Sequence, residues 1–107
     1  MTTFDKREET FERKFVLDEE LKFKAEARRN KLLGLWAADK LGMNGAEAGA
    51  YAKEIVAAAF GDAGDDDVVR KVMGDLAAKD VNVTEAEIRA RMDELTVLAS
   101  AQVKAGT

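Results

Sequence analysis

The feature that most constrains this chain is a helical repeat of apolar residues that no proline interrupts. Apolar side chains recur every three or four positions, and no segment shows the alternation typical of a strand. The 107 residues include no Pro, the residue that would end a helix by removing an amide donor. A chain of this length can bury one core. We therefore expect a single all-α domain.

Local signals divide the repeat into four helices. Acidic residues favour helix starts near Asp18 and Asp65. Asn44 and Thr84 each precede a Glu by three residues, which is the spacing of a capping box, and Gly42 favours a helix end. Short connections favour a four-helix bundle. The expected helices span about 18–41, 44–61, 65 onward and 84–103.

Each expected helix has one apolar face that predicts its buried side. The predicted residues are Leu21, Ala25, Leu32, Leu35 and Trp36 in the first helix, Ala48, Tyr51, Ala52, Ile55 and Ala59 in the second, Val69, Val72, Met73 and Leu76 in the third, and Ile88, Met92, Leu95 and Ala99 in the fourth. Gly34 and Gly74 fall inside helices, where each costs about 1 kcal/mol relative to Ala unless close packing requires it. We expect Gly49 at a close-packed position as well.

The composition excludes most chemistry. The chain has no Cys and no His, so disulfides, zinc sites and histidine general bases are absent. The aspartates after Asp62 do not follow the EF-hand pattern and suit a helix start better. We therefore expect neither an enzyme nor a metal site. No apolar run is long enough to span a membrane, and we expect a cytoplasmic protein that is not inserted in the membrane.

Charge is distributed unevenly around a net value of −4. Residues 1–31 carry nine basic and eight acidic groups, and the rest carries eight basic and thirteen acidic ones. Because the basic groups are interleaved with acids, the sequence gives little reason to bind nucleic acid. The basic residues from Lys22 to Lys31 predict a solvated helix face, and an anion site there is the alternative.

The N-terminal segment carries aromatic residues within its densest charge. In a helix, Phe4, Phe11 and Phe15 would fall within about 40° of one another and form one stripe. Two interpretations stay open. These rings pack on the bundle through a bend, or the segment is disordered when free and folds as an amphipathic helix into a groove of another protein.

Three runs of the sequence resemble a known family. They are REETFERKF at 7–15, DEELKFKAEARRNKLLGLWAA at 18–38 and GAEAGAYAKE at 45–54. They are similar to the zeta subunit family, the ATPase inhibitors of alphaproteobacterial F-type ATP synthases. The resemblance implies a four-helix bundle whose N-terminal region enters the catalytic head at an alpha/beta interface, next to the rotor, and blocks ATP hydrolysis. It also implies that adenine nucleotide binds to the bundle.

On this resemblance we expect a flexible, partly helical inhibitory arm at 1–17 and a four-helix bundle at 18–107. The expected partner-binding residues of the arm are Phe4, Lys6, Arg7, Phe11, Arg13, Lys14 and Phe15, and the expected nucleotide-binding residues are Arg28, Arg29 and Lys31. The chain needs no cofactor, and ADP or ATP is a regulatory ligand. Without His, it has no histidine pH switch.

The expected partners are the alpha, beta and gamma subunits of the ATP synthase, which would hold the protein at the inner membrane. We expect a monomer when the protein is free. Two alternative functions stay open: a helical bundle that senses adenine nucleotide, and an adaptor that binds another complex through the arm.

Overall fold

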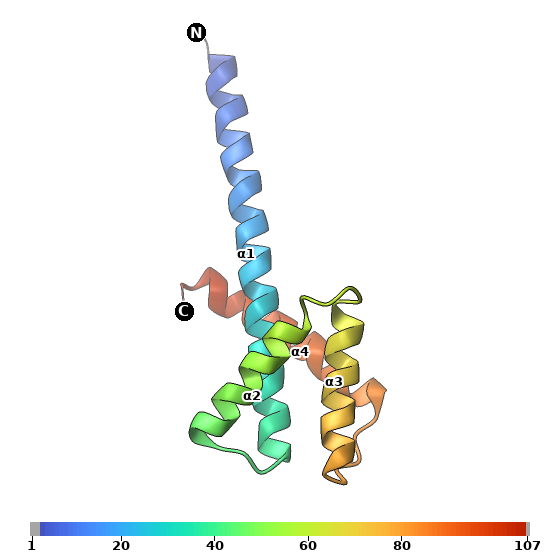
Figure 1. The fold of residues 1–107 in the computed structure, drawn as a ribbon. Helices are drawn as coiled ribbons and strands as arrows, with labels where there is room; N and C mark the ends of the chain where they lie inside the picture. Colours follow the sequence, from blue (N-terminus) through green and yellow to red (C-terminus); the bar gives the residue numbers. More distant parts are fainter. Residues whose placement is uncertain (1–2, 107) are drawn as a thin grey trace.

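Four helices make up the chain in a computed structural model, which describes the backbone of residues 3–106 and the side chains of residues 18–106. They are α1 (Thr3–Lys40), α2 (Gly45–Ala58), α3 (Asp65–Ala78) and α4 (Glu85–Lys104) (Figure 1). No strand occurs within residues 3–106. The prediction of an all-α, four-helix fold is confirmed.

Helix α1 is much longer than the others. It has 38 residues, against 14 in α2, so it extends for about 57 Å at 1.5 Å per residue. The helix start expected at Asp18 is wrong, because α1 passes through this residue. No Gly or Pro occurs from Thr3 to Leu33, and the spacing of Asp18 to Lys22 stabilises a helix interior. The N-terminal part of α1 consequently extends beyond the bundle (Figure 1).

The predicted helix ends are mostly confirmed. Thr84 precedes α4, and its hydroxyl accepts the amide of Glu87 at 3.1 Å. Asn44 precedes α2 in an extended conformation, but its side chain makes no capping hydrogen bond. Gly42 follows α1 with a φ of +80°, a left-handed conformation that favours glycine.

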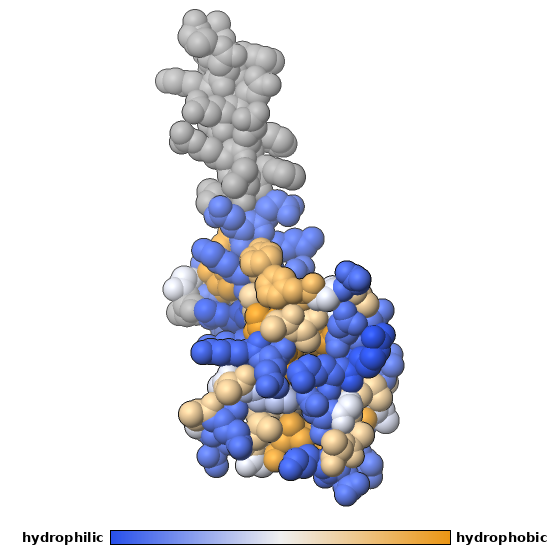
Figure 2. Space-filling model, in the orientation of Figure 1, coloured by the Kyte–Doolittle hydropathy of each residue, from blue (hydrophilic) through white to orange (hydrophobic). Residues whose placement is uncertain are grey.

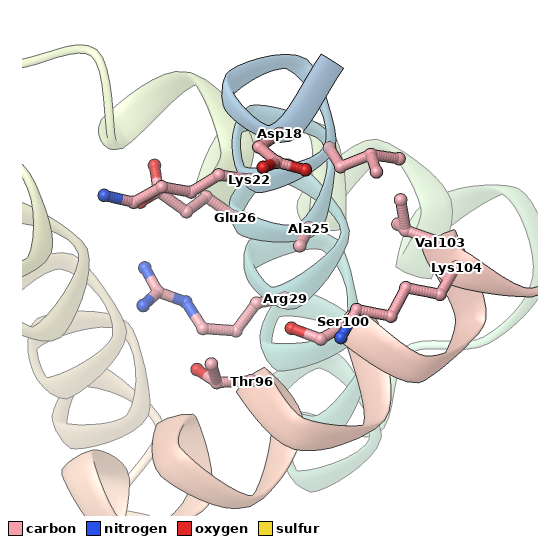
Figure 3. Close-up of a pocket in the computed structure, with 10 residues that line it drawn as sticks. Asp18, Lys22, Ala25, Glu26, Arg29, Thr96, Ser100, Val103 and Lys104 are labelled. Carbon is pink, nitrogen blue, oxygen red and sulfur yellow. The ribbon is translucent and has the colours of Figure 1, made fainter. Parts of the chain in front are cut away.

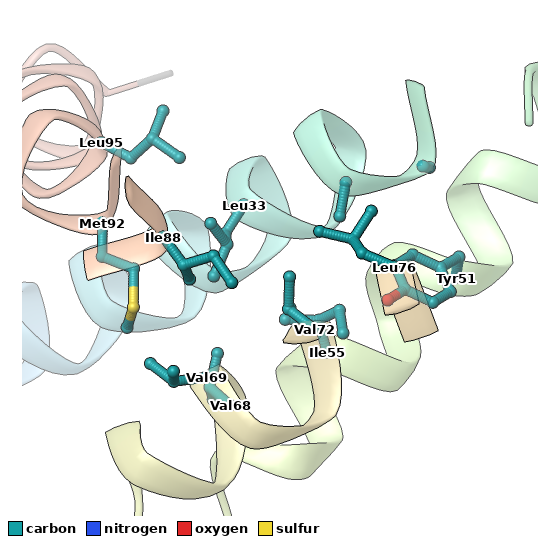
Figure 4. Packing of buried hydrophobic residues seen from close by; sticks show 12 residues of the cluster. Leu33, Tyr51, Ile55, Val68, Val69, Val72, Leu76, Ile88, Met92 and Leu95 are labelled. Carbon is teal, nitrogen blue, oxygen red and sulfur yellow. The ribbon is translucent and has the colours of Figure 1, made fainter. Parts of the chain in front are cut away.

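The core lies where the four helices meet. Helix α1 packs mainly against α2 and α4, and α3 closes the remaining side. Leu33, Ile55, Val72 and Ile88 come one from each helix, are fully buried, and point into the same interior (Figure 4). The stripes predicted for α2, α3 and α4 supply most of the core, although Ala48, Ala59 and Met73 are only partly buried.

The predicted buried face of α1 is confirmed only in part, because Leu32 and Trp36 pack against the core but are not fully buried. Leu21 and Leu35, placed in the predicted stripe, are each 36% exposed. Among the described side chains of α1, at 18–40, the buried positions are Asn30, Leu33, Gly34, Ala37 and Ala38. These residues are mostly small, and a small residue gives little hydrophobic signal in a sequence. At Gly34 the cause of the burial is a close approach of α2.

Gly34 shows how close this approach is. A Cβ atom at Gly34 would lie 2.6 Å from the Cα of Ala52, inside the contact distance of two carbon atoms. Gly34 therefore occupies a position where only glycine fits. A Cβ at Gly74 or Gly49 would meet nothing within 4 Å. The expectation of close packing at Gly49 is wrong.

The two mid-helix glycines predict opposite changes in stability. Gly34→Ala forces α1 and α2 apart and should lower the free energy of unfolding by about 1–3 kcal/mol, as overpacked cores do. Gly74→Ala removes the entropic cost of glycine in a helix and should raise it by about 0.5–1 kcal/mol. Urea unfolding followed by circular dichroism measures both. A Gly34→Ala variant as stable as the parent would contradict the close crossing.

Candidate functional site

Two hollows flank α1 where it enters the bundle. The three basic residues predicted to bind nucleotide do not share one site. Arg29 lines a hollow between α1 and α4, whereas Arg28 and Lys31 line a second hollow that also contacts α2.

The first hollow, called here the α1–α4 hollow, has a volume of about 350 Å³. Its lining combines three apolar residues, three cations, two carboxylates and two hydroxyls: Leu21, Ala25, Val103, Lys22, Arg29, Lys104, Asp18, Glu26, Thr96 and Ser100. In Figure 3 the ammonium group of Lys104 lies beside Ser100, and Asp18 lies at the opposite end of the hollow. The lining thus offers different chemical groups at its two ends.

Arg29 is held in place by two neighbours. Its side chain is 11% exposed, and its Nη2 atom donates to Asp65 Oδ1 at 2.5 Å. The same nitrogen donates to Asn30 Oδ1 at 3.0 Å. Arg29 therefore joins α1 to the start of α3 as well as lining the hollow. The sequence pattern does not reveal this pair, because 36 residues separate its members.

The second hollow, called here the basic hollow, has a volume of about 500 Å³. The described residues that line it are Phe23, Lys24, Ala27, Arg28, Lys31, Val56, Val103 and Gly106, and none of these carries a side-chain carboxylate. The Arg28 guanidinium donates to Gln102 Oε1 at 3.3 Å, which ties α1 to the end of α4. Positive charge therefore dominates this hollow.

An aromatic pair borders the basic hollow. The rings of Phe23 and Phe60 have centroids 6.5 Å apart and planes tilted by 43°. Phe23 is 61% exposed and Phe60 is 72% exposed. Sequence reasoning missed Phe60, although a large aromatic residue directly before Gly61 in a polar connection is a signal that could have found it.

Aspartates at the start of α3 form ion pairs with other helices. Asp66 accepts from Arg89 of α4 at 2.8 Å, much as Asp65 pairs with Arg29 of α1. The hydrogen bond and charge of Arg89 lower the pKa of Asp66, and Asp66 raises the pKa of Arg89 in return. Among the side chains of residues 18–106, no group of three carboxylates is placed to hold a metal ion.

A tyrosine and an aspartate connect α2 and α3. The Tyr51 hydroxyl donates to Asp75 Oδ2 at 2.7 Å, and Lys71 lies 3.2 Å from the same oxygen. Burial, and then the bond to Asp75, raise the pKa of Tyr51. The Lys71 ammonium also lies 5.8 Å from the centre of the Tyr51 ring. These contacts connect α2 to α3. The raised pKa keeps the Tyr51 hydroxyl protonated.

The predicted partner-binding side chains lie outside the described residues. They are Phe4, Lys6, Arg7, Phe11, Arg13, Lys14 and Phe15. The backbone at these positions belongs to α1. The prediction that they bind a partner stays a prediction.

The helices and the two hollows indicate the class of protein. A bundle whose first helix is far longer than the others, with lysines and arginines around two hollows, is typical of a small binding or regulatory protein. A family model described as ATPase inhibitor subunit zeta matches residues 1–102, and the chain belongs to this family. The chain is therefore an inhibitor subunit and not an enzyme, and its family implies the F-type ATP synthase as its partner.

A solved structure agrees with this fold. It is described as "Solution NMR structure of the protein" and is 53% identical to this chain, with a TM-score of 0.71. The match covers 81% of this chain and 99% of the other. No curated protein matches the chain. Within the described residues, no helix combines the length and the apolar character that crossing a membrane requires.

The ion pair between Asp66 and Arg89 predicts a pH-dependent stability. Because Arg89 lowers the pKa of Asp66 below its ordinary value of 3.8, the pair stabilises the fold above that value, and this contribution disappears as the pH falls through the lower, folded-state pKa. Asp66→Asn should therefore be less stable than the parent at pH 7 and should approach the parent's stability in acid. Urea titrations at several pH values measure this difference.

Asp62→Asn is a matched control, since Asp62 is an exposed aspartate in the connection before α3. It should show a smaller difference from the parent at every pH. A difference between parent and Asp66→Asn that grows toward acid would contradict the assigned role of Arg89.

Proposed function

We propose that this protein blocks ATP hydrolysis by inserting residues 1–17 at an alpha/beta catalytic interface of the ATP synthase head, beside the rotor gamma subunit. The observation that supports the proposal is that α1 is much longer than the part of it that packs in the bundle. None of residues 18–29 is buried, and among the side chains that the structure describes the buried positions of α1 begin at Asn30. A helix that continues so far past its own packing partners is suited to a groove in another protein.

The chemistry of the arm supports this mode of binding. Phe4, Phe11 and Phe15 would fill apolar pockets of the interface, and Lys6, Arg7, Arg13 and Lys14 would pair with acidic residues at its rim. Bound in this way, the arm would hold one catalytic interface in a single state and stop rotation. In this proposal residues 1–17 are the inhibitory arm and residues 18–107 are the body that carries it.

Aromatic and charged residues of the arm should respond differently to substitution. Phe11→Ala or Phe15→Ala should weaken inhibition about thirtyfold, equivalent to about 2 kcal/mol, if each ring is a buried anchor. Arg7→Ala or Lys14→Ala should cost less, and their effect should shrink as salt rises, because exposed ion pairs are screened. Titrating the inhibition of ATP hydrolysis at low and high ionic strength measures all four variants.

One outcome would contradict insertion of the arm. If the two Phe variants inhibited like the parent while both charge variants failed at both salt concentrations, the rings would not be anchors. The Phe residues would then pack on the bundle, which is the other interpretation that the sequence leaves open.

We propose as a second function that ADP or ATP binds in the α1–α4 hollow. A volume of about 350 Å³ is suitable for one small ligand. Lys22, Arg29 and Lys104 would neutralise phosphates, and the apolar side chains would cover the base. The carboxylates of Asp18 and Glu26 would repel phosphate, but they can accept hydrogen bonds from the adenine amino group. Of the three residues predicted to bind nucleotide, this proposal keeps Arg29.

Nucleotide binding in this hollow predicts a local response to ADP. Amide shifts on ADP titration should centre on α1 around Arg29 and on the end of α4 around Lys104. Lys104→Gln should weaken binding, since it removes a cation beside Ser100, whereas the exposed Lys79→Gln should not. Shifts that centre on Arg28 and Lys31 instead would place the nucleotide in the basic hollow and contradict this assignment.

The remaining expectations follow the same proposal. The protein would be a cytoplasmic monomer when free, held at the inner membrane only through the ATP synthase. The adaptor alternative would be favoured if a pull-down with the full chain recovered another complex in place of the subunits of the ATP synthase.

A further inference from the structure

We propose that the bundle has a second surface for the ATP synthase head, and that this surface binds an acidic segment of the head close to where the arm enters. The surface, called here the aromatic shoulder, consists of Phe23, Phe60, Lys24, Arg28 and Lys31. This inference rests on the proposed function, because it places the shoulder against the same partner as the arm.

The aromatic part of the shoulder is already assembled in the free chain. Phe23 belongs to α1 and Phe60 to the connection after α2, yet their rings adjoin at 6.5 Å. Single exposed apolar residues are common, but Phe23 adjoins Phe60 and lines the same hollow as the partly buried Val56, and such a group of apolar side chains is typical of interfaces. Figure 2 shows hydrophobic side chains gathered on the face where α1 enters the bundle. A partner would meet these rings without having to order them.

The basic residues of the shoulder indicate that its partner is acidic. Among the described residues, the hollow beside Phe23 is lined by Lys24, Arg28 and Lys31 and by no carboxylate side chain, in a chain whose net charge is −4. A basic rim around an apolar centre attracts a segment that carries acidic side chains and at least one apolar one. The complementary segment of the head is therefore acidic with an apolar anchor.

The aromatic shoulder lies close to the arm along α1, so both could contact the head at the same time. Phe23 follows Phe15 by eight residues on the same continuous helix, a distance of about 12 Å along the axis. A head that encloses residues 1–17 thus brings its outer surface next to the shoulder. The arm and the shoulder would then contact one partner together, and the shoulder would add affinity while the arm blocks catalysis.

The test is an inhibition titration of the purified catalytic head with full-length variants. Phe60→Ala should reach the same maximal inhibition as the parent at a concentration about fivefold higher or more, since an interface anchor is lost while the arm is intact. Because Phe60 is 72% exposed, its loss leaves the core in place, which urea unfolding checks. Val97→Ala is the matched control, since Val97 is 73% exposed and lies on α4 outside the shoulder.

A second pair of variants tests the charge of the partner. Lys31→Glu should weaken inhibition at low ionic strength and less at high ionic strength, because it places a carboxylate against an acidic segment. Lys79→Glu makes the same charge change at the end of α3 and should inhibit like the parent.

The outcomes separate this inference from the function on which it rests. If the parent inhibits and Phe60→Ala and Lys31→Glu match its potency, the shoulder is overturned and the arm mechanism stands. If these variants keep full potency but lose the amide shifts caused by ADP, the surface is a nucleotide site and the inference is also overturned. If the parent chain itself fails to inhibit the head, both proposals fall.

Discussion

The close crossing of α1 and α2 at Gly34 is the constraint on which the rest of the bundle depends. Since only a glycine fits against the backbone of Ala52, the two helices lie in near contact, and three of the buried residues of α1 are the small Gly34, Ala37 and Ala38. The larger neighbours, Leu32 and Trp36, are then partly buried at the edges of the crossing. With α1 held in this way, Leu33 is directed at α3 and α4 and completes the core (Figure 4).

Ion pairs fix the helix that contacts α1 least. Asp65 and Asp66 are adjacent at the start of α3, yet one pairs with Arg29 of α1 and the other with Arg89 of α4. Exposed pairs of this kind add little stability individually. Their role here is to position α3, because they connect its first residues to α1 on one side and to α4 on the other. The acidic run that the sequence assigns to a helix start thus also connects α3 to two other helices.

Sequence reasoning recovers the fold well, and the sites less well, for identifiable reasons. Helix number and most helix ends follow from local chemistry, such as the Thr84 cap, which acts over three residues. The buried face of α1 could be predicted only in part, because its small residues give little hydrophobic signal and Gly34 is buried by the close approach of α2. Arg28 and Arg29 are adjacent in sequence but line different hollows, since consecutive residues of a helix point about 100° apart. Phe60 becomes a site residue only through Phe23, which is distant in sequence.

Because α1 is one unbroken helix that continues into the bundle, the bundle also limits how deep the N-terminal part of α1 could enter a cleft of a partner. A single helix with its side chains is about 10–12 Å wide, whereas the two shorter dimensions of the molecule are 27 and 20 Å. In the proposed mode of binding, a cleft that admits one helix would be too narrow for the bundle, so the bundle would limit how deep the helix can enter. The greatest depth of insertion would then depend on the number of residues that precede the first contacts of α1 with α2 and α4. Adding or deleting a helical turn in that stretch would change reach by about 5.4 Å without altering any contact of the core.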